Sequence, residues 1–411
     1  MQPSPPASSP HSAEGEAVAH AQWGPVLALA GLHAAVSVAW VAYNLYLVEL
    51  LVRAGFDAYL AAVLITVEGI LGGLLEPLTG ALSDRARSGL FRRFFLVMGG
   101  VLASALLFLA LPLAAASARP GPATLVPALL IAWALSMAVF RAPALSLLGR
   151  HARPGALPLA ASVLTTAGAL VGAAAPSARA WLLSLGPGPT FASASAALVV
   201  SALVVRALER REPSSTAQTE SPPPLERWQV HAAWLLLGVG TVSALAFRFL
   251  VGALPRAGTG PGASAAAITT AFFAGLALAA IPVGRIALGH LGGGPVTLTG
   301  LALLVAGSVL ASRVEGGAAM LLVAALLGAA LAAVQNGLFC WSLCAIRTEH
   351  GGLGMGLLLG GGGIALGLFN VLLAVRKPAP ETSLLAAAGL YAITVGLLAA
   401  LRRTVPARPA V

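Results

Sequence analysis

The chain contains twelve apolar runs, each close to the length that crosses a lipid bilayer. About 20 apolar residues in a helix span the hydrocarbon core of a membrane. In lipid, each backbone N–H and C=O must find its hydrogen-bond partner inside the protein, so we expect helices rather than open strands. The runs fall at 23–51, 58–83, 94–117, 123–149, 157–175, 190–207, 229–254, 263–289, 295–312, 317–346, 351–375 and 383–401.

Composition excludes an ordinary soluble globular protein. Of 411 residues, 58% are hydrophobic and only 9% are charged, and the mean hydropathy is +0.90. A water-soluble chain of this length could not cover so much apolar surface with so few charges. The sequence therefore predicts an all-α membrane protein with twelve transmembrane helices and a surface in contact with the lipid bilayer.

The charge distribution predicts an orientation. The net charge of +10 does not indicate a nucleic-acid partner, because the arginines lie at the ends of apolar runs and form no single patch. With the N-terminus inside, 15 basic residues fall in inner loops and the C-terminal tail, 7 fall in outer loops, and Arg141 and Arg248 lie within helices. This bias predicts a multi-pass protein of the cytoplasmic (inner) membrane with both termini in the cytoplasm.

The two halves of the chain resemble each other. LVRAG at 51–55 and LPRAG at 254–258 are offset by 203 residues, and Pro77 and Gly80 have counterparts in Pro282 and Gly284. Such matches indicate a duplicated unit and predict two pseudo-symmetric six-helix bundles. The expected segments are a disordered cytoplasmic tail (1–22), a first bundle (23–207), a polar cytoplasmic linker (208–227), a second bundle (228–403) and a short cytoplasmic tail (404–411).

The stretch 80–93 has the highest charge density of the chain and carries a motif. It reads GALSDRARSGLFRR and contains the pattern G-x-L-S-D-R followed by a basic pair. This pattern resembles the loop between the second and third helices of the major facilitator superfamily. The longer run 69–93 is most similar to the sucrose-transporter-like branch, also called the glycoside–pentoside–hexuronide:cation symporter branch. The resemblance implies the twelve-helix major facilitator fold and a gating role for Gly80, Asp84, Arg85, Arg92 and Arg93.

Asp84 is expected to close the inner face. The helix expected at 58–83 ends there and the helix at 351–375 begins there, so Asp84 should meet the positive N-terminus of the latter near His350 and Gly351. Glycines at steps of four, at 72 and 80 in one helix and at 352, 356 and 360 in the other, would let the two helices approach closely. The alternative is an ordinary orienting charge at a helix end.

Five charged residues are predicted to lie within or near the membrane. Glu76 and Arg141 lie ~10–12 Å inside the inner boundary and are expected to pair, as a static bridge or as one that breaks during transport. Glu68 lies near mid-membrane and is the candidate for proton coupling, because burial favours a neutral carboxyl; alternatively it hydrogen-bonds to a neighbouring helix. Glu49 and Arg248, near the outer ends of their helices, are predicted to pair.

The resemblance also implies a solute cavity lined by the first, fourth, seventh and tenth helices. Amide and aromatic side chains there would suit a polyhydroxylated or mixed polar and apolar solute; alternatively they face lipid or form hydrogen bonds between helices. The candidate substrate-binding residues are Tyr43, Asn44, Tyr46, Trp133, Phe247, Gln335, Asn336 and Trp341.

No motif predicts catalysis or a cofactor. The sequence contains no G-x-x-x-x-G-K-[ST] and no H-E-x-x-H pattern, and Cys340 and Cys344 supply too few ligands for a metal site. The resemblance to the major facilitator superfamily and its sugar-transporting branch implies a monomeric secondary transporter, not an enzyme, that moves a sugar or glycoside-like solute, coupled to protons, by alternating access. Two alternatives stay open: an exporter of drug-like or lipophilic solutes, and a non-transporting membrane assembly factor built on the same fold.

Overall fold

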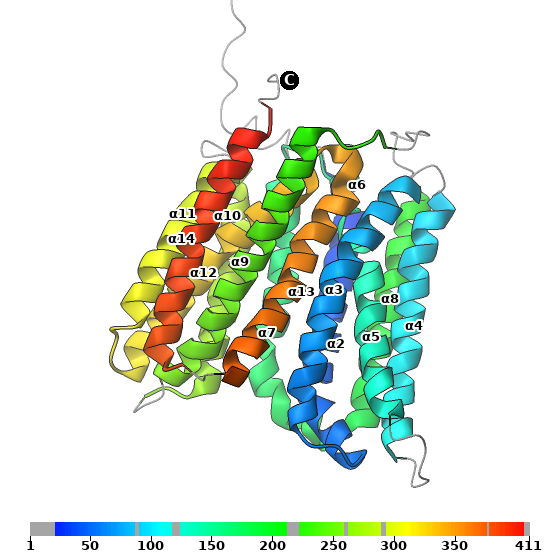
Figure 1. Cartoon of the computed structure of the whole chain (residues 1–411), viewed down its shortest axis with the longest axis vertical. Coiled ribbons are helices and arrows are strands. Elements are labelled where there is room, and N and C mark those ends of the chain that lie inside the picture. The colour runs from blue at the N-terminus through cyan, green and yellow to red at the C-terminus, as the bar shows by residue number, and fades with distance from the viewer. Residues whose placement is uncertain are drawn as a thin grey trace, which may run out of the picture.

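The computed structural model of the protein describes residues 21–86, 90–116, 124–211, 222–258, 262–288, 293–375 and 378–406. These residues contain twelve helices that are long and apolar enough to cross a membrane (Figure 1). The predicted all-helical membrane fold is confirmed.

The helices follow the predicted apolar runs closely. The first half holds α2 (Trp23–Arg53), α3 (Tyr59–Arg85), α4 (Leu90–Ala116), α5 (Leu125–Leu145) with the short α6 (Leu148–His151), α7 (Leu157–Leu185) and α8 (Pro187–Arg211). The second half holds α9 (Arg227–Ala257), α10 (Ala265–Leu288), α11 (Gly293–Ala311), α12 (Gly317–Cys344), the turn η2 (Thr348–His350), α13 (Gly351–Val375) and α14 (Pro380–Thr404).

The fifth and sixth spans are longer than their apolar runs. Helix α7 continues through Pro176 to Leu185, and α8 already begins at Pro187. A proline inside a transmembrane helix is tolerated when neighbouring groups satisfy the freed carbonyl. A proline in the first turn costs nothing, because its missing N–H would have no partner within the helix.

Successive spans run in opposite directions, so the helix ends gather at two opposite ends of the bundle. We call the end at which α3 finishes the Asp84 side and the opposite end, at which α2 finishes, the Arg53 side. The first span begins and the last span finishes on the Asp84 side, where the C-terminal end is marked in Figure 1.

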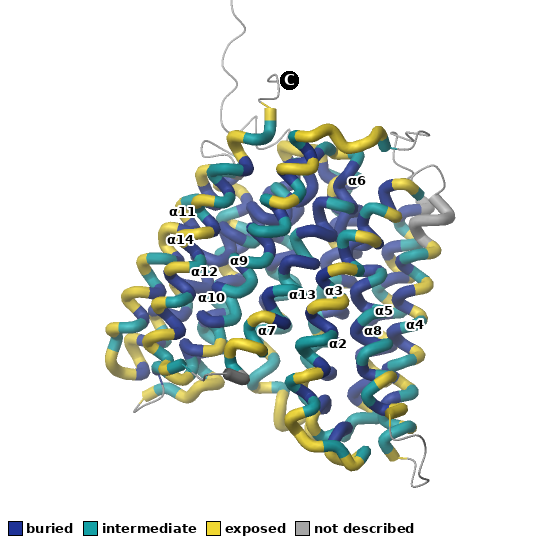
Figure 2. The backbone as a smooth tube through the Cα atoms, in the orientation of Figure 1, coloured by how far each residue is buried: buried dark blue, intermediate teal, exposed yellow. Residues whose placement is uncertain are grey.

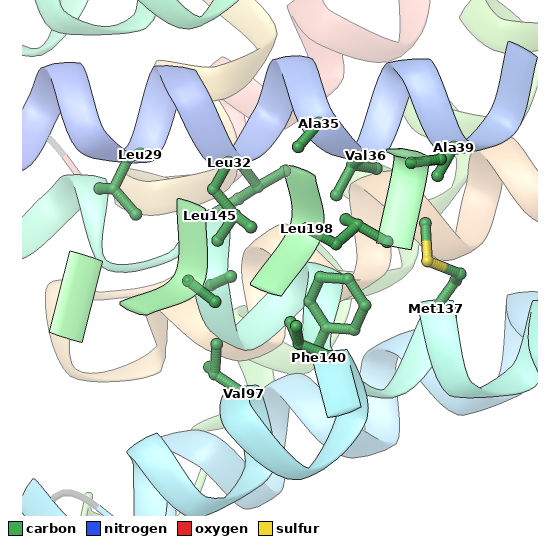
Figure 3. Close-up of a cluster of buried hydrophobic side chains, with 14 of the residues drawn as sticks. Leu29, Leu32, Ala35, Val36, Ala39, Val97, Met137, Phe140, Leu145 and Leu198 are labelled. Atoms are coloured by element: carbon green, nitrogen blue, oxygen red, sulfur yellow. The ribbon is translucent and has the colours of Figure 1, made fainter. Parts of the chain in front are cut away.

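The buried side chains form two large apolar clusters, one mainly from each half of the chain. Figure 3 shows part of the first cluster, with Leu29 and Val36 facing Met137, Phe140 and Leu198. Exposed residues lie on the outer faces of the helices and at the two ends of the bundle (Figure 2), and many of those within the helices are large and apolar. Examples are Leu74, Phe95, Leu106 and Leu278. Such a surface is stable against lipid and not against water.

Two helix–helix contacts, which we call seams, join the halves, and in both of them glycine allows the two helices to approach closely. In the first seam, α3 lies along α13: a Cβ on Gly69 would come within 2.6 Å of the Gly363 carbonyl oxygen, and a Cβ on Gly80 would overlap the Gly352 carbonyl. In the second seam, α10 lies along α7, and a Cβ on Gly284 would lie 2.7 Å from Ser162. Each seam pairs the second helix of one half with the fifth helix of the other, as the pseudo-symmetry requires.

The structure corrects the prediction of which α3 glycines face α13. Gly72 has no heavy atom within 4 Å of a built Cβ and lies on the wall of the central cavity, so it does not belong to the seam. Gly69 and Gly73 occupy the seam instead. A step of four residues drifts around a helix of 3.6 residues per turn, which is why spacing from Gly80 back to Gly72 selected the wrong face.

Candidate functional site

A cavity of about 490 Å³ lies between the two halves. Its walls come from α2, α3, α5, α9, α12 and α13, with Tyr391 of α14 at one edge. The four helices expected to line it all contribute, and the two helices of the first seam add to them. The charged and imidazole side chains on the wall are His33, Glu68, Glu76, Arg141 and Arg248, and most other wall residues are apolar.

The cavity continues toward the Arg53 side. A second hollow of about 640 Å³ shares Trp40, Asn44 and Phe247 with it. This hollow extends between α2 and α7 to Arg179 and Leu182, close to the end of α7. The two hollows together form a route from the centre of the bundle to the Arg53 side.

At the opposite end of the bundle, Asp84 links α3 to α13. The N–H groups of Gly352 and Leu353, in the first turn of α13, donate to its Oδ1 and Oδ2 at 2.9 and 2.8 Å. These N–H groups have no partner within their own helix, and the positive end of the helix favours an anion there. Asp84 is only 1% exposed. The predicted contact between Asp84 and the start of this helix is confirmed.

The other predicted gating residues surround this contact or lie beyond what is described. Gly80 lies one turn before Asp84 and lets the backbones of α3 and α13 meet. Arg85 is exposed at the end of α3. Arg92 and Arg93 belong to the first turns of α4, and their side chains lie outside the described residues.

Glu76 and Arg141 form the predicted ion pair. Arg141 Nη2 lies 3.4 Å from Glu76 Oε1, between α3 and α5. The Glu76 side chain is 4% exposed, whereas 23% of the Arg141 side chain is open toward the cavity. The pair therefore belongs to the cavity wall, and its carboxylate is held inside the protein.

Glu68 hydrogen-bonds to a neighbouring helix. The Tyr43 hydroxyl, on α2, donates to Glu68 Oε1, while Glu68 Oε2 has no hydrogen-bond partner among the described residues. The Tyr43 ring stacks on Trp133 with centroids 4.4 Å apart, and Trp133 stacks on Phe108 at 4.2 Å. This aromatic stack fixes the phenol that holds the carboxyl at the cavity wall.

The predicted pair of Glu49 with Arg248 is wrong. Glu49 instead pairs with Arg53 at 2.5 Å, one turn further along α2, where both side chains are partly exposed. Arg248 lies nine residues before the end of α9 and lines the central cavity. Glu49 does not line that cavity. It pairs with Arg53 instead, because a residue four positions further along the same helix is a nearer partner.

Four of the eight candidate substrate-binding residues line the cavity: Tyr43, Asn44, Phe247 and Gln335. The other four lie elsewhere. Successive residues of a helix point ~100° apart, so a residue close in sequence to a cavity residue can face another helix. Tyr46 donates to the Leu182 carbonyl at 2.6 Å, Asn336 donates to the Ala280 carbonyl at 2.9 Å, Trp133 belongs to the aromatic stack, and Trp341 packs against the second apolar cluster.

Sequence reasoning missed several residues of the wall. Trp40 lies one turn before Tyr43 on α2, and His33 lies two turns before Trp40 on the same face. The i, i+3 spacing from Tyr43 is the signal that could have found Trp40. Ser243 and Tyr391 also line the cavity, and neither carries a signal that separates it from an ordinary packing residue.

A polar cluster on the Asp84 side was also not foreseen. His151 at the end of α6 contacts Glu209 of α8 through Nε2, and its Nδ1 lies 2.6 Å from Gln22 Oε1. Arg150 lies 3.8 Å from Glu209. The cluster ties the start of α2, the end of α6 and the end of α8 together. The described residues contain no group of three or more histidine, cysteine or acidic side chains that could hold a metal ion.

Comparison with known proteins places the fold. No protein-family model and no curated protein matches the chain. Among solved structures, a bacterial homologue of the iron transporter ferroportin in an outward-facing state with soaked iron aligns at 16% identity with a TM-score of 0.69, over 92% of this chain and 99% of that one. The major facilitator superfamily transporter FucP, in the outward conformation, aligns at 13% identity with a TM-score of 0.62, over 93% of this chain and 99% of that one. The chain therefore has the twelve-helix fold of the major facilitator superfamily.

Proposed function

We propose that this protein is a secondary transporter that moves a small solute through its central cavity by alternating access. The observation that carries the proposal is the asymmetry of the cavity. It is closed on the Asp84 side by hydrogen bonds to the start of α13 and continues through the second hollow toward the Arg53 side. A central site open to one side between two pseudo-symmetric bundles is the arrangement that alternating access needs.

The positive-inside bias supports an orientation for this proposal. It favours the Asp84 side as the cytoplasmic side of the inner membrane, so the conformation described is outward-facing. The two solved transporters reported above are also in outward-facing states. In this orientation, Asp84, Gly80 and the neighbouring arginines form the cytoplasmic gate.

Proton coupling is the part of the proposal that Glu68 supports. It is a buried carboxyl on the cavity wall that contacts a phenol, and no described basic side chain lies within ion-pair distance of it. Such a carboxyl takes up and releases a proton as access to water changes, because ionisation in a dry site is costly. A sugar or glycoside as the solute follows from the sequence resemblance, and Asn44, Gln335 and Trp40 offer amide and ring contacts for one.

Export of a lipophilic solute is the second candidate. The mostly apolar wall of the cavity favours it, since an apolar solute gains free energy by leaving water.

A thermal-shift screen of the purified protein, followed by uptake into proteoliposomes, tests the proposed function. Sugars, glycosides, amino acids and lipophilic compounds are screened, and a solute that binds the native state raises the melting temperature. We expect one chemical class to do so and to be taken up into proteoliposomes. If no class stabilises the protein and none is transported, the proposal fails and the assembly-factor alternative gains support.

A further inference from the structure

Arg248 is a cation on the wall of the central cavity, and it has no partner among the residues that the structure describes. It lies on α9, nine residues from the Arg53-side end of the helix, so about 13 Å inside it at 1.5 Å per residue. Its side chain lines the central cavity. Among the described residues it makes no hydrogen bond and no ion pair.

The acidic side chains near the cavity are already engaged. Glu76 pairs with Arg141, Glu68 accepts a hydrogen bond from Tyr43, and Glu49 pairs with Arg53 outside the cavity. None of the three lies within ion-pair distance of Arg248. The charge of Arg141 also acts on Arg248, as it does on His33. Both carboxyl groups of the wall therefore have other partners, and Arg248 has no acidic side chain beside it among the described residues.

An uncompensated cation at membrane depth is costly, and such residues usually face a cavity and mark a substrate path. The five N–H donors of a guanidinium match the two oxygens of a carboxylate in a bidentate contact. A bound anion would supply the counter-charge that the protein does not.

We propose that the central cavity binds an amphipathic organic anion, whose acidic head contacts Arg248 and whose apolar body lies against the surrounding wall. The inference rests on the proposed transport function and replaces the neutral sugar suggested by the sequence resemblance with an anionic solute that has an apolar body. Apolar side chains dominate the wall of the same cavity. They include Phe247, Leu331, Val334, Leu358 and Leu366. A cavity of about 490 Å³ holds a molecule with a ring or a short alkyl chain and one charged group.

Matched acids and amides test the charge requirement. The probes are 4-phenylbutyrate and octanoate, each compared with its neutral amide, together with a neutral alkyl glycoside. Binding to the protein in lipid nanodiscs is measured by isothermal titration calorimetry and by thermal shift. We expect each acid to bind at least about tenfold more tightly than its amide, because the amide cannot pair with Arg248.

Arginine variants test the residue. Arg248→Gln should lose the preference for the acid, whereas Arg248→Lys should keep part of it, since it retains the charge but not the bidentate geometry. Arg256→Gln is the matched control: it removes one arginine from the exposed end of the same helix and should bind like wild type. If Arg248→Gln does not fold, the comparison of acid with amide on wild type and on Arg248→Lys still decides the question.

The outcomes separate this proposal from transport itself. Equal binding of acid and amide, or full acid binding by Arg248→Gln, would overturn the anion site. Uptake of a neutral glycoside that is insensitive to Arg248→Gln would overturn it while leaving the transporter function standing. Acid binding that depends on Arg248, without uptake of any probe into proteoliposomes, would confirm the site and contradict the transporter function.

Discussion

Gly80 of α3 and Gly352 of α13 meet backbone to backbone, and a Cβ on either one would overlap the other's carbonyl oxygen. Four residues after Gly80, Asp84 binds the N–H groups at the start of α13. The close approach brings the carboxylate within reach of these donors, so the glycine pair and the aspartate together hold α3 against α13.

Gly80→Ala should destabilise the closed seam. The added methyl group must displace backbone, and overpacking of this kind costs about 1–3 kcal/mol. We expect a melting temperature several degrees below wild type in a thermal unfolding scan. Gly72→Ala is the matched control on the same helix, because its Cβ meets no atom within 4 Å and alanine favours the helix. Equal destabilisation by both variants would show that the seam is not the cause.

Asp84→Asn should open the Asp84 side without unfolding the protein. The amide keeps one acceptor but turns an N–H₂ group toward a backbone donor, and the charge is lost. A loss of about 2 kcal/mol from charge-assisted hydrogen bonds shifts a two-state equilibrium about thirtyfold. Cys344, half-buried beside Gly351 on this side, provides the reporter in a Cys340→Ser background. Maleimide labelling of Cys344 should become faster.

Arg85→Gln controls for the loss of a charge at the same helix end, since Arg85 is exposed. It should leave Cys344 labelling close to wild type. Wild-type labelling of Asp84→Asn would remove Asp84 from the gate.

Glu76 and Arg141 should behave as a coupled pair. Removing either partner leaves a charge at the cavity wall without its counter-ion, at a cost of about 2 kcal/mol; this is less than for a fully buried pair, because 23% of the Arg141 side chain is open to the cavity. The double variant Glu76→Gln with Arg141→Gln should cost less than the sum of the single variants. Thermal unfolding of the four proteins measures the coupling. Additive effects would show that the two side chains act independently.

Glu68→Gln should separate accumulation from exchange. The amide keeps the hydrogen bond with Tyr43 but cannot carry a proton, so solute should no longer accumulate against its gradient in proteoliposomes with an imposed pH gradient. Exchange of labelled for unlabelled solute should continue. Tyr43→Phe keeps the carboxyl and should retain accumulation, with altered rate. Accumulation by Glu68→Gln would assign coupling to another group.

Glu49→Gln should have little effect. The pair with Arg53 is partly exposed and lies within one helix, so its loss costs no more than about 0.5 kcal/mol. Melting temperature and acid binding should match wild type. Reduced acid binding would instead indicate that Glu49 acts on Arg248 across the cavity.

Two kinds of feature could be predicted from the sequence: the helices, from the length of the apolar runs, and some contacts, from the depth of a residue along its helix. Apolar runs of membrane-spanning length predicted all twelve spans. Counting residues from the end of α3 placed Glu76 level with Arg141, and Asp84 level with the start of α13; both contacts are present. Depth fixes such pairs because a charge in lipid must find a partner at its own level.

Rotation about a helix axis was not predictable. Helices that are apolar on every side give no periodic signal for which face meets the cavity, so Tyr43 and Tyr46, or Gln335 and Asn336, were equal candidates although only one of each lines it. Glu49 was misassigned because Arg53, four residues away, was not weighed against the distant Arg248. The contact of His151 with Glu209 joins spans far apart in the sequence, and no local pattern marks it.

The glycine seams have a mechanical consequence. Where α3 and α13 touch, much of the contact is main chain against main chain, with side chains such as Ile364 and Pro77 added to it. In the proposed transport cycle, little side-chain interlocking at the glycines therefore opposes movement of one helix along the other. In the proposed transport cycle, the two hydrogen bonds from N–H groups of α13 to the Asp84 carboxylate must break before α3 and α13 separate at this end.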